Sequence, residues 1–164
     1  MDCCDKPEGL EKLREDYEVV RQKYNLPVFD DLNKDFAIEK ISESEVELLL
    51  REIRRFMFDK FSNYMRFLES LLNPTNASIF TFSVMKTMTS EDKRLVEEIY
   101  KKLMKVELDL MEIDAVYVEE KEAEFIKNSY SVWKDICQGW LKVIGSVKQN
   151  WDNEIKKDNT HYFG

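Results

Sequence analysis

The sequence predicts an all-α protein, an antiparallel up-down helical bundle of four long helices with one or two short helices. The chain has 164 residues, of which 43% are hydrophobic and 35% charged, with only 4 glycines and 3 prolines. This composition is typical of long helices with few turns. Apolar residues also recur at alternating spacings of three and four, which is the period of an amphipathic helix. The one alternating stretch, at residues 78–84, has no clear partner strand, so a sheet is not expected.

The first long helix is predicted over residues 8–24. Its narrow apolar stripe consists of Leu10, Leu13, Tyr17, Val20 and Tyr24. Pro27 ends it, because a proline disfavours helical backbone in the residue before it. The connection over residues 25–42 is long for a compact domain, so we expect a short helix around residues 31–35. The alternative is an arm packed by Phe29, Phe36 and Ile38.

The second long helix is predicted to begin at residues 42–45 and to end at Asn73. Its start, Ser-Glu-Ser-Glu, offers two overlapping capping boxes. Its apolar seam comprises Val46, Leu50, Ile53, Met57, Phe61, Tyr64, Leu68 and Leu71. Pro74 suits the first position of a shorter helix capped by Asn73. That helix carries Ile79, Phe80, Phe82, Val84 and Met85, and a strand is the alternative for this segment.

Two further long helices follow a turn and cap at residues 87–91. The seam of the first comprises Leu95, Ile99, Leu103, Val106, Leu110, Ile113 and Tyr117. The seam of the second comprises Ile126, Tyr130, Trp133, Cys137, Trp140, Ile144, Val147 and Trp151. Residues 118–124 between them are acidic helix formers without glycine or proline, so they either turn or continue as one rod of roughly 100 Å. Matched seam lengths favour the turn.

The chain is predicted to form one domain over residues 8–157, between a disordered N-terminus (1–7) and a flexible tail (158–164). Its three cysteines, an odd number, give no disulfide framework, which is typical of a reducing compartment. No basic start precedes an apolar run, and no stretch approaches 18 uncharged apolar residues, so we expect a cytoplasmic protein. The net charge of −8 makes nucleic acid an unlikely main partner and membrane association is not expected.

The residue types that most catalytic sites need are scarce. The single histidine, His161, lies four residues from the end, so no Ser-His or Cys-His dyad and no His-rich zinc site can be read. Cys3, Cys4, Cys137 and His161 lack a C-x-x-C knuckle. No glycine-rich phosphate loop occurs. We therefore expect no catalytic residue, no metal and no cofactor.

An acidic stretch holds eight carboxylates against the single cation Lys121. They are Glu107, Asp109, Glu112, Asp114, Glu119, Glu120, Glu122 and Glu124. Clustered carboxylates attract cations and basic partners, but most charge runs are solvated helix faces, which is the interpretation we favour here.

Arg51, Arg54 and Arg55 form a basic stretch on the second long helix. This patch predicts a binding site for a phosphate or another anionic group. The alternative is that the arginines pair with carboxylates on the same helix or with the acidic stretch across the bundle.

The final helix carries all three tryptophans on its seam. The segment Trp140, Ile144, Val147 and Trp151 predicts a contact with a protein partner or a second protomer, since tryptophans dominate binding hot spots. An ordinary bundle core is the alternative. The leading hypothesis is a non-enzymatic interaction or assembly module, and the second is a small anionic-ligand-binding or regulatory subunit that uses the three arginines.

Overall fold

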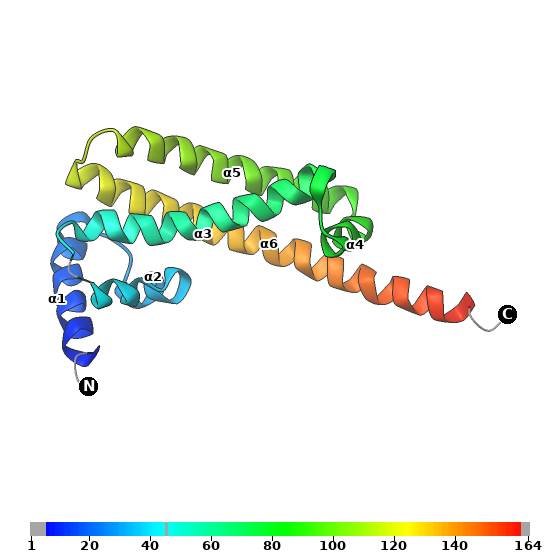
Figure 1. Cartoon of the computed structure of the whole chain (residues 1–164), viewed down its shortest axis with the longest axis horizontal. Coiled ribbons are helices and arrows are strands. Elements are labelled where there is room, and N and C mark those ends of the chain that lie inside the picture. Colours follow the sequence, from blue (N-terminus) through cyan, green and yellow to red (C-terminus); the bar gives the residue numbers. More distant parts are fainter. Residues whose placement is uncertain (1–5, 45, 162–164) are drawn as a thin grey trace. The chain divides into compact units, whose positions relative to one another are not determined.

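The computed structural model describes residues 6–44 and 46–161, with side chains described for 8–44, 46–75 and 77–153, and every element in it is a helix (Figure 1). The α-helices are α1 (Lys6–Tyr24), α2 (Phe29–Phe36), α3 (Leu49–Leu72), α4 (Ile79–Thr87), α5 (Ser90–Asp114) and α6 (Glu119–His161). Two 3-10 helices, η1 (Ile38–Glu43) and η2 (Pro74–Asn76), lie in the connections. The predicted all-α class is confirmed, and α1, α3, α5 and α6 are its long helices. Their antiparallel up-down order stays a prediction.

The chain divides into two compact units. Unit 1 comprises residues 1–62 and 106–132, and unit 2 comprises residues 63–105 and 133–164. The predicted single domain over 8–157 stays a prediction. Residues 1–5 of the predicted N-terminal segment and 162–164 of the predicted tail lie outside the described residues, while α1 already begins at Lys6. In the described ranges, none of the helices combines the length and hydrophobicity that crossing a membrane requires.

Unit 1 has an aromatic core to which the connection between α1 and α3 contributes. Tyr17 of α1 meets Phe29 of α2 edge to face, with ring centroids 5.5 Å apart. Phe36, at the other end of α2, meets Phe61 at 5.6 Å and Tyr130 at 6.5 Å. Both sequence interpretations of this connection therefore apply, because it forms a short helix and also packs through its phenylalanines.

The predicted start of the second long helix is wrong. The Ser42 hydroxyl donates to the Glu39 carbonyl at 2.7 Å inside η1, and α3 begins only at Leu49. Ile38 and Ile41 of η1 are 0% and 3% exposed. Burying these two side chains draws the chain into a 3-10 turn, and this packing outweighs the local capping preference of the serines. The end predicted at Asn73 is confirmed to within one residue, since α3 ends at Leu72.

The segment after α3 is helical, as predicted, but it divides into two pieces. Pro74 opens η2, and its preceding residue Asn73 gives no side-chain cap to the backbone. The longer helix α4 begins at Ile79, where the Ser78 hydroxyl accepts a hydrogen bond from the Thr81 backbone N–H at 3.1 Å. Ser78 is thus the N-cap that the sequence interpretation assigned to Asn73.

The junction between α5 and α6 is a turn, as favoured, but it lies earlier than predicted. The chain turns over residues 115–118, and residues 119–124 already form the start of α6 (Figure 1). Glu122 and Ala123 are 0% and 2% exposed. The sequence predicts solvated charge along this acidic segment, whereas the carboxylate of Glu122 is buried in unit 1.

Candidate functional site

The four residues predicted as a partner contact line one groove in unit 2. This groove has a volume of about 390 Å³. Its lining residues are Phe67, Phe80, Val84, Trp140, Val143, Ile144, Val147, Lys148, Trp151 and Asp152. Eight of the ten are apolar or aromatic, so the groove suits an apolar occupant. We call it the α4–α6 groove.

The aromatic residues of unit 2 divide between core and groove. Trp133 is 2% exposed and meets Tyr64 edge to face at 5.0 Å. Trp140, one heptad further along α6, is half-buried and meets Phe67 at 5.7 Å with an interplanar angle of 86°. Trp151 is also half-buried. The core interpretation therefore holds for Trp133, whereas the other two tryptophans belong to the groove wall.

Hydrogen bonds fix α6 to the start of α5 and the end of α4. The Asn150 amide donates to the Thr87 carbonyl at 2.8 Å, and the Ser146 hydroxyl donates to Asp92 Oδ2 at 2.8 Å. Asp92 also accepts from the backbone N–H and the hydroxyl of Thr89 at 2.8 and 2.7 Å, completing a capping box for α5. Burial pushes the pKa of Asp92 up, but these hydrogen bonds outweigh it and hold the pKa below its ordinary value.

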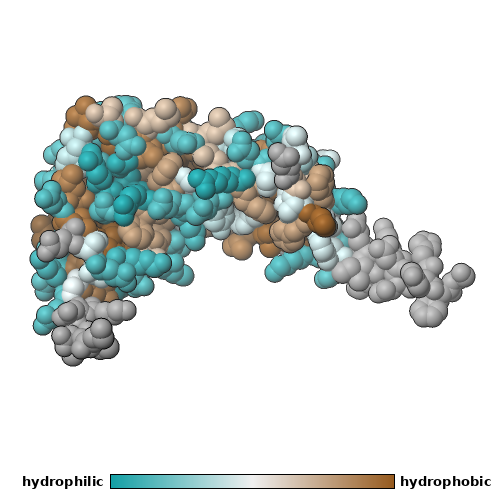
Figure 2. All heavy atoms as spheres, viewed as in Figure 1, coloured by the Kyte–Doolittle hydropathy of each residue, from teal (hydrophilic) through white to brown (hydrophobic). Residues whose placement is uncertain are grey.

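Helix α4 exposes large apolar side chains beside the groove. Ile79, Phe80 and Phe82 are 87%, 62% and 46% exposed. Figure 2 shows hydrophobic residues at the molecular surface where α4 lies. Single exposed apolar residues are ordinary, whereas α4 exposes three large ones on one short helix next to the α4–α6 groove.

The arginines predicted as an anion site are part of a charge cluster in unit 1. Arg54 is 6% exposed and donates to Glu122 Oε2 at 2.5 Å and to Asp114 Oδ1 at 2.7 Å. Glu122 itself is fully buried, and its other oxygen lies 3.7 Å from Arg51 Nε. That oxygen and Arg51 Nε are both buried without a hydrogen bond to any described residue. The cluster is thus charge-paired but incompletely hydrogen-bonded.

All three predicted arginines line one pocket of about 370 Å³, together with Glu52, Phe58, Leu110 and Asp114. Arg55 pairs with Glu52 at 2.9 Å, and Arg51 lies over the Tyr117 ring at 4.8 Å from its centroid. The pairing alternative therefore describes what these residues do in the structure. The prediction of an anionic ligand stays a prediction.

Two of the remaining acidic residues, Glu112 and Glu119, make ion pairs in unit 1. Glu119 accepts from Lys23 at 3.0 Å and from the Tyr24 hydroxyl at 2.8 Å, and these bonds lower the pKa of its carboxyl. Lys121 pairs with Glu112 at 3.1 Å. Among the described residues, no three His, Cys, Asp or Glu side chains are grouped to hold a metal ion. Cys3, Cys4 and the His161 side chain lie outside the described part.

The buried carboxylate of Glu122 was missed by sequence reasoning, although a signal exists. Glu122 lies four residues before Ile126, which places it on the apolar seam of α6. Arg54 lies likewise between the seam residues Leu50 and Met57. Opposite charges on two buried seams indicate an ion pair inside the core.

Comparisons with known proteins add no relative. A scan against protein-family models finds no match, and searches of the curated proteins and of the solved structures find none. The fold and the groove therefore define the class: an all-α protein with an exposed apolar groove.

Proposed function

We propose that this protein is a non-enzymatic assembly module that associates with a second copy of itself through the α4–α6 groove. The observation that carries the proposal is that Trp140, Ile144, Val147 and Trp151 line one largely apolar groove. Half-buried tryptophans in such a groove are typical binding anchors. An amphipathic helix is the occupant that such a groove fits best, because its apolar stripe can fill the space along its length.

The end of α6 supplies a helix of this kind. Its seam continues with the same alternation of three and four residues up to Trp151. Asn150, whose amide donates to the Thr87 carbonyl, is followed by a last part of α6 that extends from Trp151 to His161. In a second copy, we propose that the seam of α6 up to Trp151 enters the groove.

The charges on the groove's edge favour a second copy in antiparallel orientation. Lys148 and Asp152 are the two charged lining residues, and neither forms an ion pair with a described side chain. If two α6 helices cross antiparallel about a two-fold axis near residue 150, Lys148 of each protomer faces Asp152 of the other. The contact is then self-complementary in charge as well as apolar.

Light scattering at high micromolar concentration tests the proposal. The natural chain is expected to be a dimer, and Trp151→Asp to be a monomer. The matched control is Leu141→Asp on the same helix, because Leu141 is 70% exposed and lies outside the groove lining. A monomeric natural chain, or equal dissociation by both variants, contradicts the proposal.

A small anionic ligand at the arginine pocket is the second candidate function. It is favoured by Arg51 Nε, a buried donor without a hydrogen bond to a described residue. Titration with inorganic phosphate tests it, with Arg51→Gln and Arg55→Gln combined. Saturable binding that the double variant loses supports this site, and unchanged binding counts against it.

A further inference from the structure

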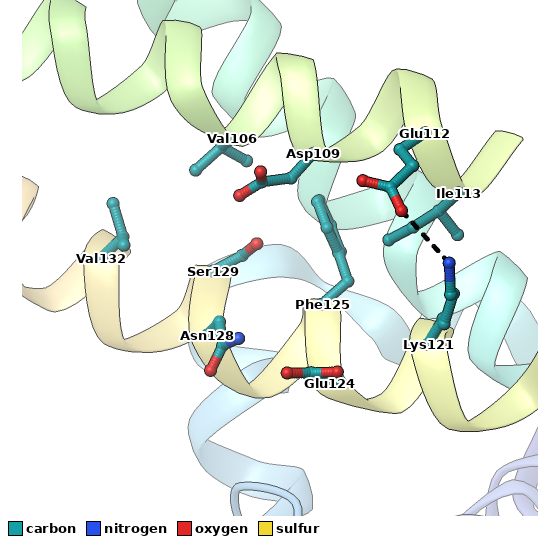
Figure 3. A pocket seen from close by; sticks show the side chains of 10 residues that line it. All are labelled: Val106, Asp109, Glu112, Ile113, Lys121, Glu124, Phe125, Asn128, Ser129 and Val132. Carbon is teal, nitrogen blue, oxygen red and sulfur yellow. Dashed lines mark hydrogen bonds and ion pairs between the residues drawn. The ribbon is translucent and has the colours of Figure 1, made fainter.

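A second pocket lies between the end of α5 and the start of α6, within unit 1. Its volume is about 260 Å³. Its lining residues are Val106, Asp109, Glu112, Ile113, Lys121, Glu124, Phe125, Asn128, Ser129 and Val132 (Figure 3). The proposed dimer contact does not use these residues.

The rim of this pocket has an excess of negative charge. Three carboxylates, Asp109, Glu112 and Glu124, stand against the one ammonium group of Lys121, a formal balance of −2. Lys121 forms an ion pair with Glu112 at 3.1 Å, which Figure 3 draws as a dashed line. Asp109 and Glu124 make no ion pair or hydrogen bond with a described side chain. Two carboxylates therefore remain available to a cation.

The hydroxyl group of Ser129 lies in the wall of the pocket. Ser129 is 3% exposed, and its hydroxyl makes no hydrogen bond with another described residue. Figure 3 shows this hydroxyl on α6 below the Asp109 carboxylate of α5 and pointing toward the side of Phe125. This hydroxyl oxygen lines the pocket, so an ammonium group of a ligand can donate a hydrogen bond to it.

The rest of the lining is apolar. Phe125, Val106 and Ile113 are 4%, 4% and 7% exposed, and Figure 3 shows the Phe125 ring rising from α6 toward α5 between Asp109 and Ile113. A ligand that fills this pocket therefore combines positive charge with a hydrocarbon part. An aromatic ring beside carboxylates also attracts an ammonium group directly.

We propose that this pocket binds a linear polyamine, with its ammonium groups on Asp109, Glu124 and Ser129 and its methylene chain against Phe125. A metal ion is a poor fit, since the carboxylates are not grouped to coordinate one ion. Separate ammonium groups on a flexible chain can reach separate carboxylates, and each offers three donors. The acidic stretch then supplies a binding site as well as solvated charge.

Isothermal titration calorimetry with spermidine, at physiological salt, tests the proposal. One spermidine is expected to bind per chain. Asp109→Asn combined with Glu124→Gln is expected to weaken binding by about tenfold, because two partly exposed charge pairs are lost. Both side chains are exposed, so these changes leave the fold intact.

Two further variants separate a built site from diffuse attraction to an acidic protein. Glu11→Gln combined with Glu15→Gln removes the same charge from exposed positions of α1 and is expected to change affinity by less than about twofold. Ser129→Ala keeps the net charge and is expected to weaken binding by about fivefold. Absence of saturable binding, equal weakening by both double variants, or full affinity in Ser129→Ala overturns the proposal.

Discussion

Replacing Glu122 with leucine removes the carboxylate that neutralises Arg54 inside unit 1. Arg54, 6% exposed, then keeps one ion-pair partner among the described residues, Asp114, whose side chain is 59% exposed and therefore partly screened. Removing one partner of a buried ion pair costs about 3 kcal/mol when a second partner remains, at the low end of the usual range. For 164 residues the unfolding entropy is about 0.34 kcal/mol/K, so the melting temperature falls by about 9 °C.

Urea denaturation followed by circular dichroism measures this loss. The double variant Arg54→Met with Glu122→Leu removes both charges, so it is expected to regain at least about 1 kcal/mol over Glu122→Leu alone. A single-variant loss under about 1 kcal/mol refutes the assignment of this pair as a buried, coupled interaction, and so does a double variant less stable than the single one.

Other predictions concern the anchoring of α5 and α6 in unit 2. Asp92→Asn is expected to lower the free energy of unfolding by about 1 to 2 kcal/mol at pH 7, measured by urea denaturation, because it weakens a helix cap. The pKa of folded Asp92 lies below its ordinary value, so its stabilising contribution is present above about pH 4 and lost as pH falls through the folded pKa. The natural chain should therefore lose more stability than Asp92→Asn below pH 4, and parallel pH curves would count against this role. Gly145→Ala is expected to raise the free energy of unfolding by about 0.5 to 1 kcal/mol, since an added methyl meets nothing within 4 Å. Gly139→Ala should gain less in the same assay, because its methyl would lie 3.3 Å from Ile99 Cδ1, and an equal gain would show that Ile99 shifts freely.

The spacing of apolar residues predicted the positions of the long helices closely. The first helix ends at Tyr24 as predicted, because its seam ends there and Pro27 follows. The third long helix begins where the sequence indicates, since Thr89 and Asp92 form a local cap that needs nothing beyond its own segment. At these two positions the local signals were sufficient, whereas the local cap signal of Asn73 was not, since Ser78 caps α4 instead.

The errors arose where packing overrode a local signal. The serines at the predicted start of the second long helix are good caps, but burial of Ile38 and Ile41 places this segment in a 3-10 helix instead. Residues 119–124 of the acidic junction are helical, which agrees with their lack of glycine and proline. The turn between α5 and α6 lies just before them, at residues 115–118. Polarity suggested a solvated turn, whereas Arg54 brings Glu122 into the core.

The candidate sites were predictable to different degrees. The groove residues on α6 could be read from the heptad spacing, but Phe80 could not be assigned to the same surface, because only the folded chain brings α4 beside α6. The polyamine proposal depends on Ser129, whose hydroxyl makes no hydrogen bond with another described residue. This is a property of side-chain geometry and leaves no trace in the sequence.

Self-association through α6 is tested most directly by mixing two charge-reversed chains. In Lys148→Glu and in Asp152→Lys, each homodimer would place like charges opposite one another, which destabilises the contact. Mixing the two restores opposite charges at both positions of the antiparallel pair. Sedimentation velocity is expected to show a dimer for the natural chain, monomers for each variant alone and a dimer for the mixture. A mixture that stays monomeric while the natural chain is a dimer contradicts antiparallel pairing about residue 150, and a natural chain that is monomeric contradicts self-association altogether.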